Sequence, residues 1–500
     1  MLIRPGIGDI RLIFYHIGKI IIIVGFSLLF PLFTAIFFQE KAPQIDFLFS
    51  FLLFLNIGLF LTLFFKIEKE MRWMHAMVIV SLSWLFMAIL GAIPLYLSGH
   101  WGSFLDAVFE AMSGFATTGL TLAKDPEHLS MAHQMWRHLM QFIGGQGIVI
   151  MALSFLGKGL GGVFRIYIGE AREEKIFPNI IDTARFMWVL SIIYLLLGSF
   201  ILGGILRLEG FSLKSAFFQG LFIFMAGFAT GGFTPYSQSI LYYHSFSFEL
   251  ATIFIMFLGM INFKLHYSLW TGNRKEFWRD IEIITLSFTI FSTFLLVAMG
   301  LSEKGIYPQA IALFRQGFYQ LISAHTGTGY MTIYAKEFIK GWLGLAMVGI
   351  IIAMGLGGAT CSTAGGIKAL RIGLVFKAFL QDVKQLMQPD NTVLVEKFHH
   401  IRDFVLEDRY VRSAATIFLA YLILYFLGAI VGMLCGYPFL EALFESTSAG
   451  ANVGLSCGIT SPSMPTILKI TYIFEMWIGR LEFVAIFTLW GFIIALVKGK

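Results

Sequence analysis

Long stretches without a single acidic or basic residue run through most of this chain. A helix needs about 20 mostly apolar residues to cross the hydrocarbon core of a membrane. Windows that approach or exceed this length lie at residues 20–38, 47–65, 73–105, 186–206, 215–248, 283–302, 341–367 and 413–440. Charged residues make up only 13% of the chain, whereas about 25% is usual for a soluble protein. We therefore expect an all-α integral membrane protein.

Several of these windows are longer than one crossing and continue through glycine, threonine and serine. Irregular backbone at membrane depth is tolerated only where protein buries it or where it lines a wet cavity, because lipid cannot hydrogen-bond its amides and carbonyls. We therefore expect ten crossings and four loops that enter the membrane without crossing it. Most of the 36 Lys and Arg residues then fall on one side, together with both chain ends. The positive-inside rule makes that side cytoplasmic.

An internal repeat underlies the four loops. Residues 106–121 align with residues 441–456 without a gap, so that equivalent positions differ by 335 (441 − 106). Weaker copies of the loop lie at residues 227–234 and 323–331. Each copy predicts a unit of outer helix, short half-helix, Thr/Gly loop and inner helix. Units of equal orientation can surround one axis along the membrane normal.

The repeats predict how the chain is divided. We expect an N-terminal two-helix addition at residues 1–72, four pore units, and a cytoplasmic loop at residues 379–410 whose mixed charges suit the docking of a partner. The four pore units are expected at residues 73–158, 184–272, 281–378 and 411–500.

The composition of the loops predicts a cation pore. Glycine permits a backbone whose carbonyls turn toward an axis, where they can replace the water shell of a monovalent cation. Each half-helix ends in mid-membrane with its negative dipole end toward the axis, which favours a cation there. A single Gly-Thr-Gly loop is more often a simple helix break, but four copies at matching positions favour the pore.

These features resemble a known family. The four loops, together with residues 262–267, 357–368 and 479–482, are similar to those of the Trk/Ktr/HKT superfamily of potassium transporters, most closely the TrkH subunits of bacterial Trk potassium uptake systems. The resemblance covers nearly the whole chain. The two extra spans before residue 70 look like the addition that separates TrkH from the shorter KtrB.

The resemblance implies a function and its partners. It implies potassium uptake across the bacterial inner membrane through a gated, channel-like pore, with K⁺ as the transported ion and no tightly bound cofactor. It further implies a homodimer and a TrkA-like cytoplasmic ring that binds nucleotides. The alternative is a sodium-dependent or weakly selective K⁺/Na⁺ transporter of the Ktr type.

The resemblance also implies which residues hold the ion. One glycine per loop is shared, but the loops differ from one another and the pair Asn452-Val453 departs furthest from the Thr/Gly pattern, which suggests milder rejection of sodium. The implied potassium ligands are Thr117, Thr118, Gly119, Thr230, Gly231, Gly232, Gly327, Thr328, Gly329, Asn452, Val453 and Gly454.

Small and polar residues interrupt the third inner helix at residues 357–368. In the family this stretch is an intramembrane loop beneath the filter, where it acts as a gate; the alternative is a packing kink. Lys368 and Arg371 are expected at the cytoplasmic interface. The candidate gate residues are Gly357, Gly358, Thr360, Ser362, Thr363, Gly365 and Gly366.

Arg480 is the most informative single residue. An arginine at the centre of a bilayer costs at least about 2.5 kcal/mol, so that it must pair or face a water-filled path. The repeat alignment places it level with Gly145 on the first inner helix, which favours a position at the axis. There it would form a positive gate below the filter. An ion pair with Glu482 or Glu475 is the alternative, and the two can coexist.

The remaining polar residues give weaker signals. Glu110 and its equivalent Glu445 are expected to tie half-helices to their neighbours, or else to line the ion entrance. His133, His138 and the pair His399-His400 are expected at the surface, without other metal ligands. A membrane enzyme is not expected, because the sequence has no His-Glu-x-x-His motif and no paired aspartates on neighbouring spans.

Overall fold

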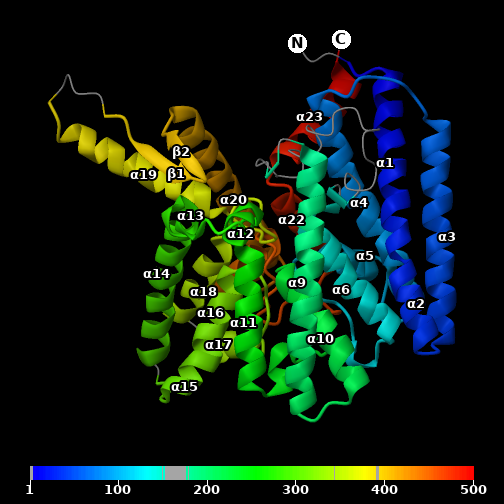
Figure 1. Cartoon of the computed structure of the whole chain (residues 1–500), viewed down its shortest axis with the longest axis horizontal. Coiled ribbons are helices and arrows are strands. Elements are labelled where there is room, and N and C mark those ends of the chain that lie inside the picture. Colours follow the sequence, from blue (N-terminus) through cyan, green and yellow to red (C-terminus); the bar gives the residue numbers. More distant parts are fainter. Residues whose placement is uncertain are drawn as a thin grey trace.

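The computed structural model describes residues 4–148, 150–151, 176–177, 179–303, 305–342, 344–389 and 394–499. In this part of the chain the regular structure is helical except for one two-stranded sheet (Figure 1). The expected all-α membrane class is therefore confirmed, with a short β-hairpin as an addition. Residue 158, where the first pore unit is expected to end, lies outside the described residues.

Three helices form the N-terminal layer at one edge of the molecule (Figure 1): α1 (Ile7–Ser27), α2 (Leu29–Phe37) and α3 (Lys41–Phe64). Gly18 of α1 and Gly58 of α3 bring these two helices close together, since a Cβ atom on Gly18 would lie 2.8 Å from the carbonyl oxygen of Gly58. Small residues at such crossings are how helices approach in a membrane. Asp9 fixes the start of α1 by accepting hydrogen bonds from Lys69 (2.5 Å) and His75 (2.8 Å).

The rest of the chain repeats one order of elements four times, with outer helix, half-helix and inner helix in turn. The outer helices are α4 (Trp73–Leu97), α9 (Ile180–Leu208), α14 (Ile281–Glu303) and α20 (Asp408–Leu434). The half-helices are α5 (Phe104–Phe115), α10 (Leu213–Phe228), α16 (Tyr319–His325) and α21 (Phe439–Gly450). The inner helices are α6 (Met131–Gln146), α11 (Phe246–Met260), α18 (Leu345–Gly355) and α22 (Thr466–Arg480).

Shorter elements connect these helices. The third half-helix begins with α15 (Ala310–Ala312) and a π-helical turn, η4 (Leu313–Phe318). The other connecting elements are η1 (Pro126–His128), η3 (Ser239–Tyr243), α12 (Phe263–Trp270), α13 (Arg274–Arg279), α17 (Glu337–Lys340), α19 (Ala369–Leu386), β1 (Lys397–His400), β2 (Arg402–Val405) and α23 (Val484–Lys498).

The half-helices are too short to cross a membrane. Helix α5 has 12 residues and is therefore about 18 Å long. Ser103 and Ser212 begin α5 and α10 by accepting a hydrogen bond from the backbone amide three residues later, which is the usual way that serine caps a helix. The residues that follow each half-helix form the Thr/Gly loops.

The four sets of helices pack in a closed ring. Each half-helix contacts its own outer helix and also an inner helix of a neighbouring set: α10 contacts α6, α16 contacts α11, α21 contacts α18, and α5 contacts α22. The last contact joins the fourth set to the first. The loops at the ends of the half-helices are thereby gathered in one place.

Two of the inner helices end in a sharp bend. Helix α11 is bent by 104° relative to α12, and α22 by 111° relative to α23. In the described residues, six helices are long and apolar enough to span a membrane, or eight if each bent pair is one span. The ten expected crossings differ from this number because α6 and α18 have only 16 and 11 residues.

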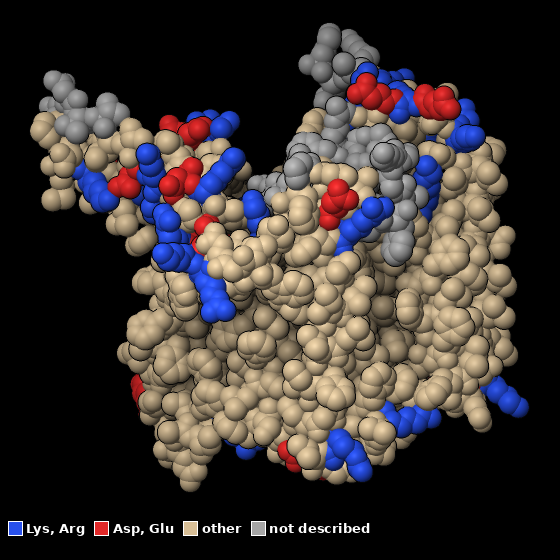
Figure 2. All heavy atoms as spheres, in the orientation of Figure 1, with Lys and Arg blue, Asp and Glu red and all other residues tan. Residues whose placement is uncertain are grey.

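The charges of the molecule lie at its two ends. Figure 2 shows Lys and Arg gathered mainly on the face that also carries both chain ends in Figure 1, with a broad band almost free of charge below it. The hairpin β1–β2 lies at the same charged face. It packs through Phe398 against Ile281 of α14 and Leu374 of α19 in a small cluster of apolar side chains.

Candidate pore and gate

The four Thr/Gly loops share one backbone conformation. In each loop the first residue and the third have positive φ, a region that favours glycine at the third position because a Cβ atom is strained there. The first residues are Thr117, Thr230, Gly327 and Asn452, with φ of 54°, 49°, 75° and 56°. The third residues are Gly119, Gly232, Gly329 and Gly454, with φ of 92°, 75°, 82° and 90°.

Each loop is tied to the half-helix that precedes it in the same way. The amide of the second loop residue donates a hydrogen bond to a carbonyl five residues earlier, and the first residue donates to one three residues earlier. These contacts satisfy carbonyls that a helix end otherwise leaves open. The second-residue bonds are Thr118 to Ser113 (2.8 Å), Gly231 to Ala226 (2.8 Å), Thr328 to Ser323 (3.0 Å) and Val453 to Ser448 (2.9 Å).

The loops touch one another in a closed ring. A Cβ atom added to the shared glycine of any loop would overlap the carbonyl oxygen of the second residue in the neighbouring loop. The pairs of glycine and carbonyl are Gly119 with Gly231, Gly232 with Thr328, Gly329 with Val453, and Gly454 with Thr118. Four backbone carbonyls are thus held side by side, and only glycine leaves room for them.

Buried polar side chains brace the first loop. Glu110 of α5 accepts hydrogen bonds from the Thr121 hydroxyl (2.8 Å), the Leu122 amide (2.9 Å) and Nε of Arg137 (2.9 Å). Arg137 also donates to the carbonyl of Thr234 (3.2 Å), which follows the second loop. Both charged side chains are almost completely buried. This ion pair therefore connects two neighbouring loops.

The equivalent acid of the fourth set has the same position but different donors. Glu445 accepts from the hydroxyls of Ser456 (2.5 Å) and Thr460 (2.7 Å) and from the amide of Cys457 (2.9 Å). The expectation that Glu110 and Glu445 tie half-helices to their surroundings agrees with these contacts. Gln141, which no sequence motif singles out, likewise donates a hydrogen bond to the carbonyl of Gly231.

The fourth loop departs from the others in sequence but takes part in the ring. Its Asn452 side chain donates to the Thr118 hydroxyl (3.0 Å) and to the Met476 carbonyl (2.9 Å). One amide group therefore joins the fourth loop to the first and to the fourth inner helix. The Asn452 amide has two N–H donors and can make both hydrogen bonds at once, whereas a threonine hydroxyl has only one donor.

A cavity of about 180 Å³ lies on one side of the ring. All four shared glycines line it, together with Arg137 and several hydroxyl side chains. The four loops thus line one end of this cavity.

The stretch at residues 357–368 is a folded-back loop on the other side of the ring. Its two ends join through hydrogen bonds from the Gly357 amide to the Ile367 carbonyl (2.8 Å) and from the Ile367 amide to the Gly355 carbonyl (3.1 Å). A Cβ atom on Gly357 would overlap the carbonyl oxygen of Gly365. The glycines that interrupt the helix are thus needed for the close approach of the two arms.

Thr363 holds this loop against the second set of helices. Its hydroxyl lies 2.8 Å from the carbonyls of both Phe228 and Gly259, and its amide donates to Gly259 (3.1 Å). The hydroxyl of Thr230, the first residue of the second Thr/Gly loop, lies 3.4 Å from that of Thr363. A Cβ atom on Gly365 would overlap the carbonyl of Ala451, next to the fourth loop.

Arg480 completes the layer beneath the ring. Its guanidinium donates to the Thr117 hydroxyl (3.1 Å), to the Thr363 carbonyl (2.8 Å) and to the Gly144 carbonyl (2.6 Å). The expected position beside Gly145 agrees with a further hydrogen bond of 3.3 Å to that residue's carbonyl. Arg480 therefore lies under the first loop and bridges it to the folded-back loop.

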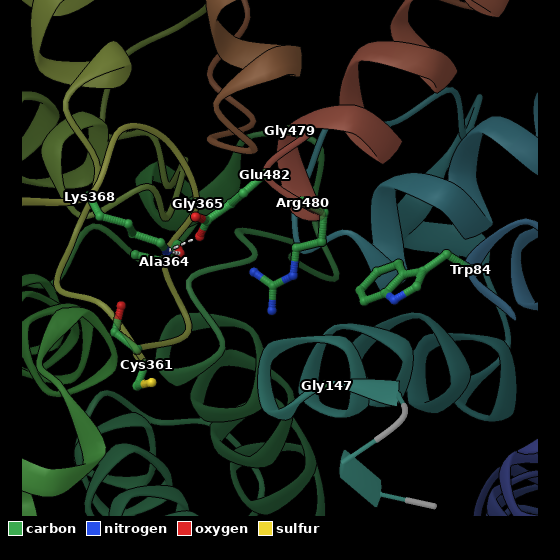
Figure 3. A pocket seen from close by; sticks show the side chains of 10 residues that line it. Trp84, Gly147, Cys361, Ala364, Gly365, Lys368, Gly479, Arg480 and Glu482 are labelled. Atoms are coloured by element: carbon green, nitrogen blue, oxygen red, sulfur yellow. Dashed lines mark hydrogen bonds and ion pairs between the residues drawn. The ribbon is translucent and has the colours of Figure 1, made fainter. Parts of the chain in front are cut away.

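The space beneath the ring is small. A cavity of about 20 Å³ is lined by Arg480, Lys368 and Gly365, among others (Figure 3). One water molecule needs roughly 10–15 Å³ of such volume, so that a hydrated cation does not fit.

One prediction about this region needs correction. Lys368 is buried and lines the cavity, where its ammonium donates to the Ala364 carbonyl, instead of lying at the interface. Glu482, just after Arg480, lies 3.8 Å from Lys368 and forms an ion pair with Arg371. Because the contacts of Glu482 join residues more than 100 positions apart in the chain, sequence spacing did not predict them.

The prediction of surface histidines is wrong for three of the four. His133 and His138 are buried in α6, and His400 is buried at the end of β1. Nε2 of His133 donates a hydrogen bond to the Pro94 carbonyl (3.0 Å), and Nδ1 of His138 donates one to the Gln134 carbonyl (2.7 Å). A histidine between apolar helices is buried at little cost when a neighbouring carbonyl accepts a hydrogen bond from its ring N–H, and such a partner cannot be predicted from the sequence alone.

The chain is similar to known transport proteins along most of its length. A family model named TrkH and described as a cation transport protein matches residues 43–494. An uncharacterized cation transporter of Methanocaldococcus jannaschii is 33% identical over 490 residues, which cover 97% of this chain and 96% of that protein. The Trk system potassium uptake protein TrkG of Escherichia coli is 28% identical over 490 residues, covering 95% and 96%.

A solved structure has the same fold. The crystal structure of the potassium transporter TrkH from Vibrio parahaemolyticus superposes with a TM-score of 0.80 at 25% sequence identity. The match covers 96% of this chain and 98% of that one.

Proposed function

The chain belongs to the TrkH family of cation transport proteins, and from this premise we propose that it takes up potassium across the cytoplasmic membrane. The ion passes through a single pore between the four repeats. Two relatives carry potassium uptake in their names, and the whole length of the chain takes part in the similarity. The protein is on this account a multi-pass membrane transporter.

One observation carries the proposal, namely the closed ring of Gly119, Gly232, Gly329 and Gly454 against four neighbouring carbonyls. A dehydrated cation needs oxygen ligands in place of its water shell, and backbone carbonyls held in a ring provide them. We assign the ion ligands to the three residues of each loop, 117–119, 230–232, 327–329 and 452–454. The differing loop sequences are consistent with moderate selectivity for potassium over sodium.

The gate consists of Arg480 and the folded-back loop 357–368. Together they lie below three of the four filter loops and leave a cavity with room for about one water. The fixed charge of Arg480 opposes a cation that leaves the filter, because charges interact strongly where water is scarce. Transport therefore requires the loop and Arg480 to move aside.

The orientation follows from charge. The face that carries most Lys and Arg and both chain ends (Figure 2) is assigned to the cytoplasm by the positive-inside rule. We keep the unit boundaries expected from the sequence, with an addition at 1–72, pore units at 73–158, 184–272, 281–378 and 411–500, and a cytoplasmic segment at 379–410. This segment and the loop ends near it are where a TrkA-like nucleotide-binding ring would dock, and two copies of the chain would form the transporter.

The experiment is rescue of a bacterium that lacks potassium uptake, at limiting potassium, combined with flux in liposomes. Purified protein should carry rubidium, a stand-in for potassium, and potassium should compete with rubidium at lower concentration than sodium does. Equal competition by sodium would instead support the weakly selective Ktr-type alternative. Folded protein that moves neither ion, with or without a TrkA-like partner, would contradict the proposal.

A further inference from the structure

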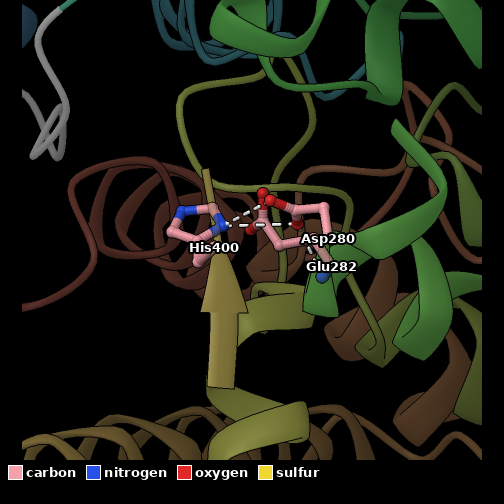
Figure 4. Close-up of side chains that lie close together, drawn as sticks. All are labelled: Asp280, Glu282 and His400. Carbon is pink, nitrogen blue, oxygen red and sulfur yellow. Dashed lines mark hydrogen bonds and ion pairs between the residues drawn. The ribbon is translucent and has the colours of Figure 1, made fainter. Parts of the chain in front are cut away.

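Three buried side chains from distant parts of the chain meet at the charged face. Asp280 and Glu282 lie at the start of α14, and His400 lies at the end of β1 (Figure 4). Asp280 and Glu282 have no exposed surface, and His400 is 6% exposed. One ligand atom from each of the three lies within 4.8 Å of the other two. Figure 4 shows the imidazole directed at both carboxylates.

The spacing of these atoms suits a single metal ion. His400 Nδ1 lies 3.0 Å from Oδ2 and 3.3 Å from Oδ1 of Asp280. Nitrogen and oxygen ligands lie about 2.0–2.2 Å from zinc, so that two ligands of one tetrahedral ion are separated by roughly 3.4 Å. The three side chains therefore need only small shifts to surround one ion.

The chemistry of the three groups selects a class of ion. Two carboxylates and one imidazole are the ligand set of divalent transition metals, and zinc with three protein ligands takes water as its fourth. A divalent ion also balances the charge of two buried carboxylates while His400 stays neutral. Buried charges require such compensation.

Backbone amides hold both carboxylates in place. Asp280 accepts from the amides of Glu282 (2.8 Å) and Ile401 (3.1 Å). Glu282 accepts from the amide of Thr360 (2.6 Å) and lies 3.4 Å from the Asn262 side chain. Outer partners of this kind orient metal ligands, and a carboxylate oxygen that accepts one hydrogen bond keeps capacity for a metal.

We propose that Asp280, Glu282 and His400 form a binding site for a divalent transition metal, with zinc as the ion that fits best. The site contacts two further parts of the protein through Glu282. Thr360 belongs to the folded-back loop, and Asn262 lies at the break between α11 and α12. An occupied site would hold the hairpin, the start of α14 and this loop together. The inference stands on the geometry of the three residues and does not depend on which ion the pore carries.

The test measures metal binding to the full-length protein in detergent, purified with a tag that contains no histidine. The protein is stripped with a chelator, loaded with zinc, freed of excess metal and analysed by mass spectrometry for zinc content. We expect one zinc per chain in the parent and at least a tenfold lower zinc content in the His400→Asn and Asp280→Asn variants. The matched control is His399→Asn, which changes the neighbouring histidine of the same hairpin and should keep its zinc.

A second measurement needs no substitution. X-ray absorption at the zinc edge of the loaded parent should show only nitrogen and oxygen ligands at about 2.0–2.2 Å, with one imidazole. A parent that retains no zinc, equal zinc in the parent and the His400→Asn variant, or sulfur ligands at the metal would each overturn the proposal. The three residues would then be a histidine–carboxylate network without metal.

Discussion

The guanidinium of Arg480 donates a hydrogen bond of 2.8 Å to the carbonyl oxygen of Thr363. Arg480 ends the fourth inner helix at its 111° bend, and Thr363 lies in the folded-back loop of the third. The bond therefore links two interruptions of helices in neighbouring repeats. It is charge-assisted and partly buried, which makes it stronger than an ordinary hydrogen bond.

Replacement of Arg480 by alanine should raise basal rubidium flux about tenfold. A hydrogen bond from a charged donor contributes about 1.5–3 kcal/mol, and 1.4 kcal/mol corresponds to a factor of ten in the balance between closed and open forms. The substitution also removes the positive charge from the path. The measurement is rubidium uptake into liposomes at matched protein density.

The Arg480→Lys variant separates the effect of the positive charge from the effect of the guanidinium's hydrogen bonds. Lysine keeps the charge but cannot reach several acceptors with one planar group, so its flux should lie between those of the parent and Arg480→Ala. If Arg480→Ala lowers flux or leaves it unchanged in folded protein, the gate does not depend on this residue.

Replacement of Gly119 by alanine should abolish flux. The residue has φ of 92° and a Cβ atom would overlap the Gly231 carbonyl, so the ring of carbonyls must open. The control is Gly436→Ala, because Gly436 has φ of 93° but nothing within 4 Å of an added Cβ atom. Both variants carry a backbone cost of about 1–2 kcal/mol, and only the first should lose transport. Normal rubidium flux in the Gly119→Ala variant would contradict the proposal that the four loops form the ion filter.

Replacement of Thr363 by valine should raise basal flux about fivefold. Valine has nearly the same shape but lacks the hydroxyl that contacts Phe228 and Gly259, and the loss of a hydrogen bond weakens the closed form by about 1 kcal/mol. Thr416→Val is the control, since its hydroxyl bonds to Arg412 within the exposed face of α20. Equal flux in both variants would show that the loop is held in other ways.

Replacement of Glu110 by glutamine should lower the unfolding temperature more than Glu445→Gln does. The change leaves Arg137 buried without its carboxylate, which costs about 3–5 kcal/mol, whereas Glu445 accepts from hydroxyls and amides. Thermal unfolding in detergent, followed by tryptophan fluorescence, measures the difference. The double variant Glu110→Gln, Arg137→Met should recover part of the loss, and equal effects at the two acids would contradict this account.

Much of the fold follows from local patterns in the sequence. Charge-free windows predict the outer helices because lipid excludes charge, and the repeat of residues 106–121 at 441–456 predicts two equivalent half-helices and loops. The position of Arg480 beside Gly145 could likewise be predicted, because the repeat alignment alone pairs these two residues. These features depend on residues close together in the chain or on a constant offset.

Other features could not be predicted because they join residues without a shared pattern. The burial of His400 against Asp280 requires a hairpin to fold back across 120 residues of chain. Lys368 was expected at the interface because a lysine usually reaches water, but the folded-back loop carries it beneath the ring.

The most direct test of the pore is to locate the ion itself. A structure determined with thallium or rubidium in place of potassium should show anomalous density on the axis between the four loops, in contact with the carbonyls of Thr118, Gly231, Thr328 and Val453. The density should disappear in Gly119→Ala and persist in Gly436→Ala. Density elsewhere in the protein, with none inside the ring, would contradict the account.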